Sequence, residues 1–216
     1  MSVDPRKRQK RLEKQKAKKK AERKETARRQ SQGMPVRLEA ASRAPILHCC
    51  CLKALWEVGM GNVLVSRELS SGNVAYVMFL VDTYCLGVKD VFSNIVPRAV
   101  YENKIYDRLL AQGSVQHLKP ECARKLVEGA VEYARALELP PHADYRAGKL
   151  IFGDISAAAC TQEFVFGHEG KPFFYAGPHD NAARCEDILR TLNRVCGPDG
   201  YHFIMPAGGP SLDLDN

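Results

Sequence analysis

Four aspartates and one histidine are the residues of this sequence whose types could carry chemistry. Asp82 and Asp90 flank a glycine-containing turn that follows a long apolar run, whereas His142, Asp144 and Asp154 lie in a loop-rich stretch further along the chain. Carboxylates that meet at one place can bind a divalent metal ion and support phosphodiester cleavage. These five residues are therefore the candidate catalytic groups, provided that the fold brings them together.

Each of these residues also has a structural interpretation, which we favour. An Asp at the end of a strand commonly accepts hydrogen bonds from the turn that follows, as Asp82 could do. The segments around Asp144 and Asp154 are typical of surface loops held by Asp turns. We predict no cofactor and no resident metal ion.

The eight cysteines indicate packing more than reactivity. No Cys-x-x-Cys pair occurs, which argues against zinc-ribbon and thioredoxin-like sites. The run Cys49–Cys51 beside His48 cannot easily converge on one ion, because successive strand residues point to opposite faces. Cys85 could act as a nucleophile with His142 or His168, but no glycine elbow supports this role. The sequence shows neither a signal peptide nor an apolar run of about 18 residues, so we expect reduced thiols and a cytoplasmic protein.

The first thirty residues form a strongly basic arm. They carry fourteen basic and four acidic residues, a net charge of +10; because the whole chain carries +7, residues 31–216 carry −3. Leu12 is the only large apolar side chain in residues 5–30, so a helix there has no apolar face to pack on a core. We expect the arm to be disordered, or helical when a polyanion binds. Its basic residues are Arg6, Lys7, Arg8, Lys10, Arg11, Lys14, Lys16, Lys18, Lys19, Lys20, Arg23, Lys24, Arg28 and Arg29.

Such an arm is typical of a segment that binds phosphates with little sequence selectivity. No aromatic residue lies among its basic residues, so base stacking is not available to it. We predict that residues 5–30 bind nucleic acid, RNA in preference to DNA. The alternatives are a solubilising tail, or contact with an acidic protein or membrane surface; without an amphipathic stripe the membrane alternative is disfavoured.

The remainder of the chain predicts a single α+β domain with a mixed or antiparallel sheet, β-hairpins and about three packed helices. Four regions follow from composition: the basic arm 1–30, a linker 31–44, the domain 45–205 and an acidic flexible tail 206–216. The expected strands are 45–52, a hairpin of 61–68 with 74–82, a second hairpin of 163–167 with 172–175, and 201–205. The expected helices are 96–112, 120–139 and 180–195, the last capped by Asp180.

Several segments resemble an uncharacterised group of bacterial proteins that also begin with a Lys/Arg-rich stretch. These segments are Val81–Asp90 (VDTYCLGVKD), His142–Arg146 (HADYR), Phe152–Ile155 (FGDI) and Gly197–His202 (GPDGYH), and the resemblance covers most of residues 45–205. It implies a bacterial cytosolic protein. It assigns no activity and no catalytic residue.

The sequence thus favours a non-enzymatic RNA- or ribonucleoprotein-binding protein that is tethered by its basic arm. One alternative is a metal-dependent nuclease or hydrolase that uses Asp82, Asp90, Asp144 and Asp154. Another is a protein-interaction module, in which the acidic domain binds a protein partner and the arm only keeps it in solution. No membrane partner is expected.

Overall fold

Apolar runs in the first half of the chain form a five-stranded antiparallel sheet with the strand order β4-β3-β2-β1-β5. The computed structural model describes residues 33–177 and 180–204, so the basic arm and the acidic tail lie outside the described residues. The strands are β1 (Ile46–Leu52), β2 (Met60–Glu68), β3 (Asn73–Asp82), β4 (Gly87–Pro97) and β5 (Val115–His117). With the helices around the sheet, this confirms the predicted α+β class.

Successive side chains along a strand point to opposite faces of the sheet, and in β1, β2 and β3 apolar side chains occupy both faces. The predicted hairpin of β2 and β3 is confirmed, with Val65 opposite Val77 in the register. On β1, Cys49 and Cys51 pack in one hydrophobic cluster and Cys50 packs in another. The three cysteines therefore point to alternating faces, as the strand geometry requires, and serve as core residues.

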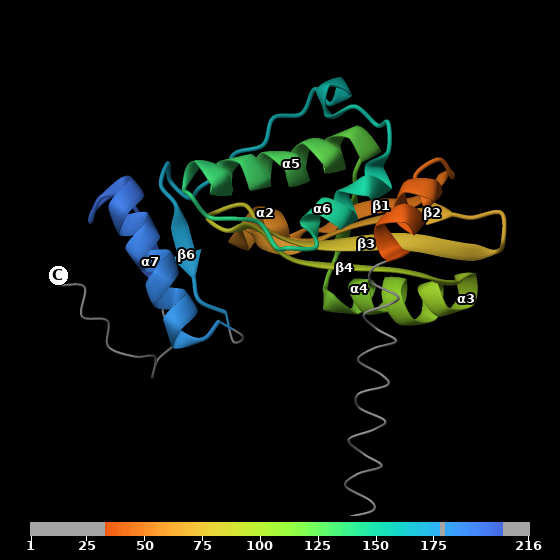
Figure 1. Cartoon of the computed structure of the whole chain (residues 1–216), viewed down its shortest axis with the longest axis horizontal. Helices are drawn as coiled ribbons and strands as arrows, with labels where there is room; N and C mark the ends of the chain where they lie inside the picture. Colours follow the sequence, from red (N-terminus) through yellow and green to blue (C-terminus); the bar gives the residue numbers. More distant parts are fainter. Residues whose placement is uncertain (1–32, 178–179, 205–216) are drawn as a thin grey trace, which may run out of the picture.

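Helices cover both faces of the sheet (Figure 1). The long helix α5 (Pro120–Ala136), the helical residues 33–41 and α6 (Tyr145–Gly148) pack on one face. On the other face lie α3 (Arg98–Tyr101), a π-helical turn (Glu102–Tyr106) and α4 (Asp107–Gln112). The seven buried residues of α5 form one apolar face that is spaced at helical intervals.

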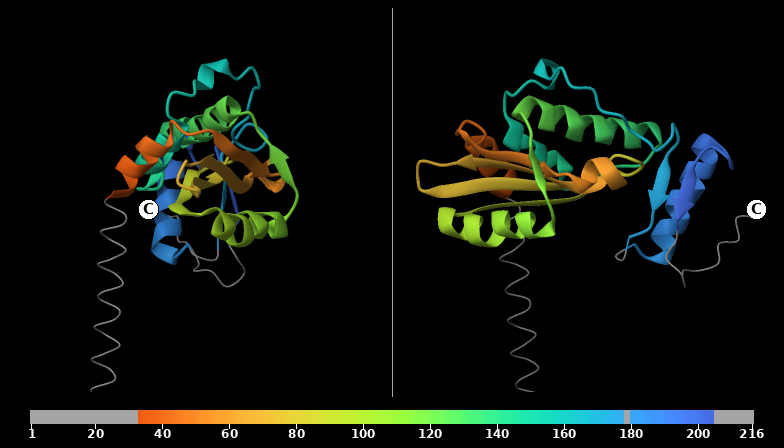
Figure 2. Two further views of the ribbon diagram at one scale, coloured as in Figure 1. Left: turned by 90° about the vertical axis from the view of Figure 1, so that its right-hand side faces the viewer. Right: turned by 180° about the vertical axis from the view of Figure 1, so that it is seen from behind.

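The C-terminal elements pack beside one end of this sheet. The strands β6 (Phe173–Tyr175) and β7 (His202–Ile204) pair in parallel, and α7 (Ala182–Cys196) packs against them. These elements lie next to the short helix α2 (Ala54–Val58), as Figure 1 and the right view of Figure 2 show. Two short 3-10 turns, Lys149–Phe152 and Ala157–Ala159, complete the elements.

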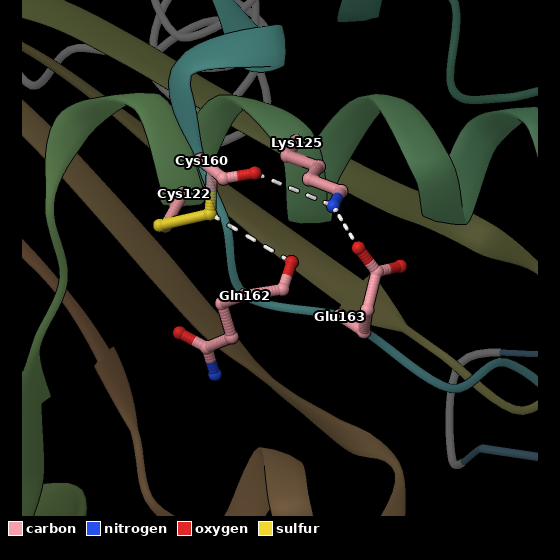
Figure 3. Close-up of a disulfide and its surroundings, with 5 residues drawn as sticks. All are labelled: Cys122, Lys125, Cys160, Gln162 and Glu163. Atoms are coloured by element: carbon pink, nitrogen blue, oxygen red, sulfur yellow. Dashed lines mark hydrogen bonds and ion pairs between the residues drawn. A yellow bond between two sulfur atoms is a disulfide. The ribbon is translucent and has the colours of Figure 1, made fainter.

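A disulfide between Cys122 and Cys160 ties the loop after the second 3-10 turn to the first turn of α5 (Figure 3). The expectation that all eight cysteines are reduced thiols is therefore wrong. Next to the disulfide, Lys125 contacts the Cys160 carbonyl and the carboxylate of Glu163. The six other cysteines are free, and five of these are buried.

The start of the described chain differs from the prediction. Residues 33–41, expected to lie in a linker, are helical, and their side chains Met34, Leu38 and Ala41 are buried in the main core. Gly33 and Pro35 are residues typical of loops, and for this reason composition alone indicated a linker. The helical spacing of Met34, Leu38 and Ala41 was the signal for a packed helix. Helix 96–112 is broadly confirmed, but Val96 and Pro97 belong to the preceding strand β4, which the sequence analysis missed.

The second predicted hairpin is wrong. Residues 163–167 form no strand, although His168 and Lys171 make an isolated bridge at the expected turn. Phe166 instead stacks on Tyr133 of α5, and β6 pairs with the distant β7. The N-cap of α7 also differs, because Asn181 accepts the hydrogen bond from the Arg184 N–H, whereas Asp180 bonds to Gly177 and Lys89.

Candidate anion-binding site

Four basic side chains line one pocket on the α5 side of the sheet. Arg43 follows the helical residues 33–41, Arg67 comes from β2, Arg124 from α5, and Lys149 from the 3-10 turn. The pocket has a volume of about 540 Å³, and its acidic lining residues are Glu39 and Asp154. Four cationic groups against two carboxylates leave an excess of positive charge in a domain that is otherwise slightly acidic.

Arg67 is the buried cation of the site. Its Nε donates to the Ile151 carbonyl at 2.9 Å, and its two terminal nitrogens donate to the carbonyls of Ala44 at 2.6 Å and Phe152 at 3.1 Å. These three carbonyl groups satisfy hydrogen bonds of the guanidinium but carry no charge. Among the described residues, no carboxylate forms an ion pair with Arg67. Burial lowers the pKa of Arg67, whereas the nearby Asp154 raises it; a guanidinium remains charged nonetheless.

One wall of the pocket is fixed where the chain at Gly153 approaches Ser42 closely. Gly153 has φ of +58°, and a Cβ atom there would lie 2.9 Å from the Ser42 side chain. Arg124 holds the same loop from the other side, because it donates to the Gly153 and Ile155 carbonyls at 3.1 and 2.6 Å. The loop that carries Asp154 is thereby held in a defined place beside the cations.

Arg43 and Lys149 supply the accessible charge of the pocket. Both are exposed, and neither has an ion-pair partner among residues 33–177 and 180–204. Lys149 lies over the Tyr145 ring at 5.9 Å, a contact that leaves its charge available to a ligand. Exposed Arg and Lys around a buried guanidinium form a site that suits phosphate oxygens.

The pocket lies close to the root of the basic arm. The arm joins the described chain at Gly33, and the helical residues 33–41 lead from there to Ser42 and Arg43 at the pocket. A nine-residue helix spans about 13 Å, which is the distance from the pocket to Gly33, the first described residue after the arm. One extended polyanion could contact both.

The predicted catalytic residues divide into three places. Asp154 lines the basic pocket. His142 lies between Asp90 and Asp144, with Nε2 3.7 Å from Asp90 Oδ1 and Nδ1 3.9 Å from Asp144 Oδ2. These two carboxylates are largely exposed, and the separations are longer than hydrogen bonds. The arrangement is a surface cluster, with no nucleophile among its members.

Asp82 is buried at the end of β3, where its Oδ1 accepts hydrogen bonds from the Tyr84 and Cys85 N–H groups at 2.9 and 3.0 Å. The structural interpretation of Asp82 as a turn-stabilising residue is thus confirmed. Burial raises its pKa, against the opposing effect of the N–H donors and Lys89. Burial, with Asp82 nearby, also raises the pKa of the Cys85 thiol, so Cys85 is an inert core residue and no nucleophile.

The carboxylates do not assemble as the nuclease alternative requires. Within the described ranges, no group of three or more His, Cys, Asp or Glu side chains is arranged to hold a metal ion. Asp82, Asp90 with Asp144, and Asp154 occupy separate environments. The proposal of a shared carboxylate metal site is therefore wrong.

Sequence reasoning missed the four basic residues of the pocket. A weak signal for one of them was present, because Arg67 lies on the predicted strand 61–68, shortly after its apolar residues 63–65. A charged residue on a strand is seldom buried unless it has partners that compensate its charge. Arg43, Arg124 and Lys149 carried no comparable signal, since single basic residues on loops and helix surfaces are ordinary.

Comparisons of the chain with protein-family models, with curated proteins and with solved structures found no match of any of the three kinds. No helix in the described part of the chain is both long and apolar enough to cross a bilayer. The function must therefore be inferred from the site itself.

Proposed function

We propose that this protein binds nucleic acid, RNA in preference to DNA, through its basic arm and the basic pocket acting on one polyanion. The observation that carries the proposal is the buried guanidinium of Arg67, which has carbonyl partners only and lies beneath the exposed charges of Arg43 and Lys149. A phosphate group would supply the countercharge that the pocket lacks. The arm adds ten net charges at a distance of one short helix.

The two regions would contribute differently. The arm has no aromatic residues on which bases could stack, so its affinity is electrostatic and largely independent of sequence. The pocket has fixed walls and can select the position of a phosphate. In this proposal the protein acts by binding and carries out no reaction of its own.

Removal of residues 1–30 tests the contribution of the arm. We expect affinity for a structured RNA to fall roughly 10- to 100-fold and the dependence of affinity on salt to become much weaker, because fewer counterions are released on binding. Fluorescence anisotropy over a salt series, with an RNA hairpin and a DNA duplex of equal length, measures both effects. A full-length chain in which the fourteen basic residues of the arm are replaced by Gln is the matched control for length.

Equal affinities of the full-length and shortened chains, with little salt dependence, would contradict nucleic-acid binding by the arm. Tighter binding of the DNA duplex than of the RNA hairpin would contradict the preference for RNA.

A further inference from the structure

A second pocket, of opposite chemistry, lies where the main sheet meets the β6–β7 pair. It has a volume of about 540 Å³, within the range of small-molecule sites. Its walls come from the end of α2, from the ends of β2 and β3, and from β6 and β7, the region where Figure 2 shows α2 beside β6. This pocket shares no residue with the basic pocket.

Aromatic rings form the inner wall of this second pocket. The ring centroid of His168 lies 5.0 Å from that of Tyr84 and 5.4 Å from that of Phe173. Tyr84 is fixed from behind by Gly59, because a Cβ atom at that residue would fall within 2.3 Å of the Tyr84 ring. The Phe173 N–H donates to the Tyr84 carbonyl at 3.1 Å, which joins the two ring-bearing segments. The aromatic wall is therefore preorganised.

The charged groups of the wall are acidic. Glu57 and Asp82 line the pocket, and no Lys or Arg is among its lining residues. The Oδ2 atom of Asp82 is the one buried side-chain nitrogen or oxygen in the described chain that has no hydrogen-bond partner. Lys89 is the cation whose charge acts on Asp82, but Lys89 is already paired with Asp180 at 3.2 Å. Exposed Glu57 therefore supplies the negative charge of the pocket, whereas buried Asp82 supplies an oxygen atom that has no hydrogen-bond partner.

The rim of the pocket is apolar and open to solvent. Val58, Tyr175 and Ile204 are 61%, 52% and 49% exposed, and all three border the opening. Tyr175 and Ile204 are direct partners in the β6–β7 register, so their side chains are held side by side. Large apolar side chains gathered at one opening are typical of a binding surface.

We propose that this pocket binds a small organic cation, an alkylated ammonium whose apolar body contacts the rim and the aromatic rings and whose charge is met by the Glu57 carboxylate and the unpartnered Oδ2 atom of Asp82. Aromatic faces attract cations through their quadrupole, most strongly where water is excluded. A phosphate-bearing ligand is disfavoured, because the Glu57 carboxylate would repel it and no Lys or Arg lines the pocket. The proposal is independent of nucleic-acid binding, since it concerns different residues.

The test is a proton NMR titration of the full-length protein with choline and with its neutral dimethylbutanol isostere, in which carbon replaces the quaternary nitrogen. We expect choline to shift the tyrosine ring resonances and to bind at least about tenfold more tightly than the isostere. Tyr175→Ala and Glu57→Gln, both at exposed residues, should each weaken choline binding about tenfold. Glu132→Gln, at an exposed residue of α5 outside the pocket, is the control and should bind choline as the wild type does.

Equal binding of choline and the isostere, or no binding of either, would overturn the proposal. So would choline affinity that Tyr175→Ala and Glu57→Gln leave unchanged, since the cation would then bind elsewhere. Displacement of choline by adenosine, with tighter binding of the nucleoside, would show that the aromatic wall receives a base in place of a cation and would also overturn it.

Discussion

Replacement of Cys160 by Ser is expected to lower the free energy of unfolding by about 4 kcal/mol, because the disulfide to Cys122 closes a loop with a sequence separation of 38 residues. The cross-link reduces the conformational entropy of the unfolded chain, and longer loops give a larger effect. Within the folded protein, the same bond holds the segment before Phe164 and Phe166 against α5. Without it, the contacts of Lys125 and the packing of the two phenylalanines against the main core remain to hold this segment.

Urea unfolding with and without a reductant measures this effect. The wild type should lose stability when the reductant is added, whereas Cys160→Ser should not respond. Cys196→Ser is the matched control, because Cys196 is a free and partly exposed thiol; a change within about 0.5 kcal/mol is expected there. A wild type that is equally stable under both conditions would contradict the stabilising role of the disulfide.

Replacement of Asp180 by Asn is expected to cost about 3 kcal/mol, because it leaves the Lys89 ammonium buried without its partner. The two side chains are 9% and 4% exposed and lie 3.2 Å apart, joining β4 to the start of α7. Lys89 reaches this position because the β3–β4 register shifts between Leu80 and Val81, which makes Lys89 the additional residue of a bulge. The ion pair is thus a main polar link between the sheet and the C-terminal elements.

The same pair predicts a dependence on pH. Burial alone would raise the pKa of Asp180, but the Gly177 N–H, Lys89 and Arg184 outweigh burial and lower it below its ordinary value of 3.8. A carboxyl with a lowered pKa stabilises the fold above the pKa that it has when unfolded, and this stabilisation is lost as the pH falls through the folded pKa. Wild type and Asp180→Asn should therefore differ in stability at neutral pH and converge in acid.

Asp187→Asn is the control for Asp180→Asn, since its ion pair with Arg190 on the same helix is exposed. It should change stability by less than about 0.5 kcal/mol. Urea unfolding, followed by far-UV circular dichroism, distinguishes the two. Equal effects of the two substitutions would show that burial of the Lys89–Asp180 pair has no energetic consequence.

Much of the fold could be predicted from local patterns. The apolar runs of β2 and β3 around Ser70–Asn73 predicted their hairpin, and the spacing of Cys122, Leu126 and Ala130 predicted α5. These elements follow from short-range periodicity, which a sequence displays directly. The alternation of Cys49–Cys51 between two clusters was predictable for the same reason.

Long-range pairing could not be predicted in this way. The parallel partners β6 and β7 are separated by the whole of α7, so the aromatic residues of β6 indicated a local hairpin instead. Eight cysteines likewise permit many pairings, and the spacing of Cys122 and Cys160 does not distinguish theirs. Both features depend on which segments the tertiary fold brings together.

The candidate site was the least predictable part of the molecule. Asp154 was the one predicted residue that lines the basic pocket, and it was selected for a metal role that the structure does not support. The net acidity of residues 31–216 concealed a local excess of positive charge, because net charge says nothing about where charges meet.

The most direct test of the central claim is the salt dependence of RNA binding by full-length Arg43→Glu/Lys149→Glu. The control is full-length Arg108→Glu/Arg190→Glu, which makes the same change in net charge at exposed residues outside the basic pocket. If the pocket and the arm bind one polyanion, the slope of log affinity against log salt should fall by about two for the pocket variant, roughly one for each phosphate that it no longer neutralises. Identical slopes and affinities for the pocket and control variants would contradict the account, because the pocket would then have no part in binding RNA.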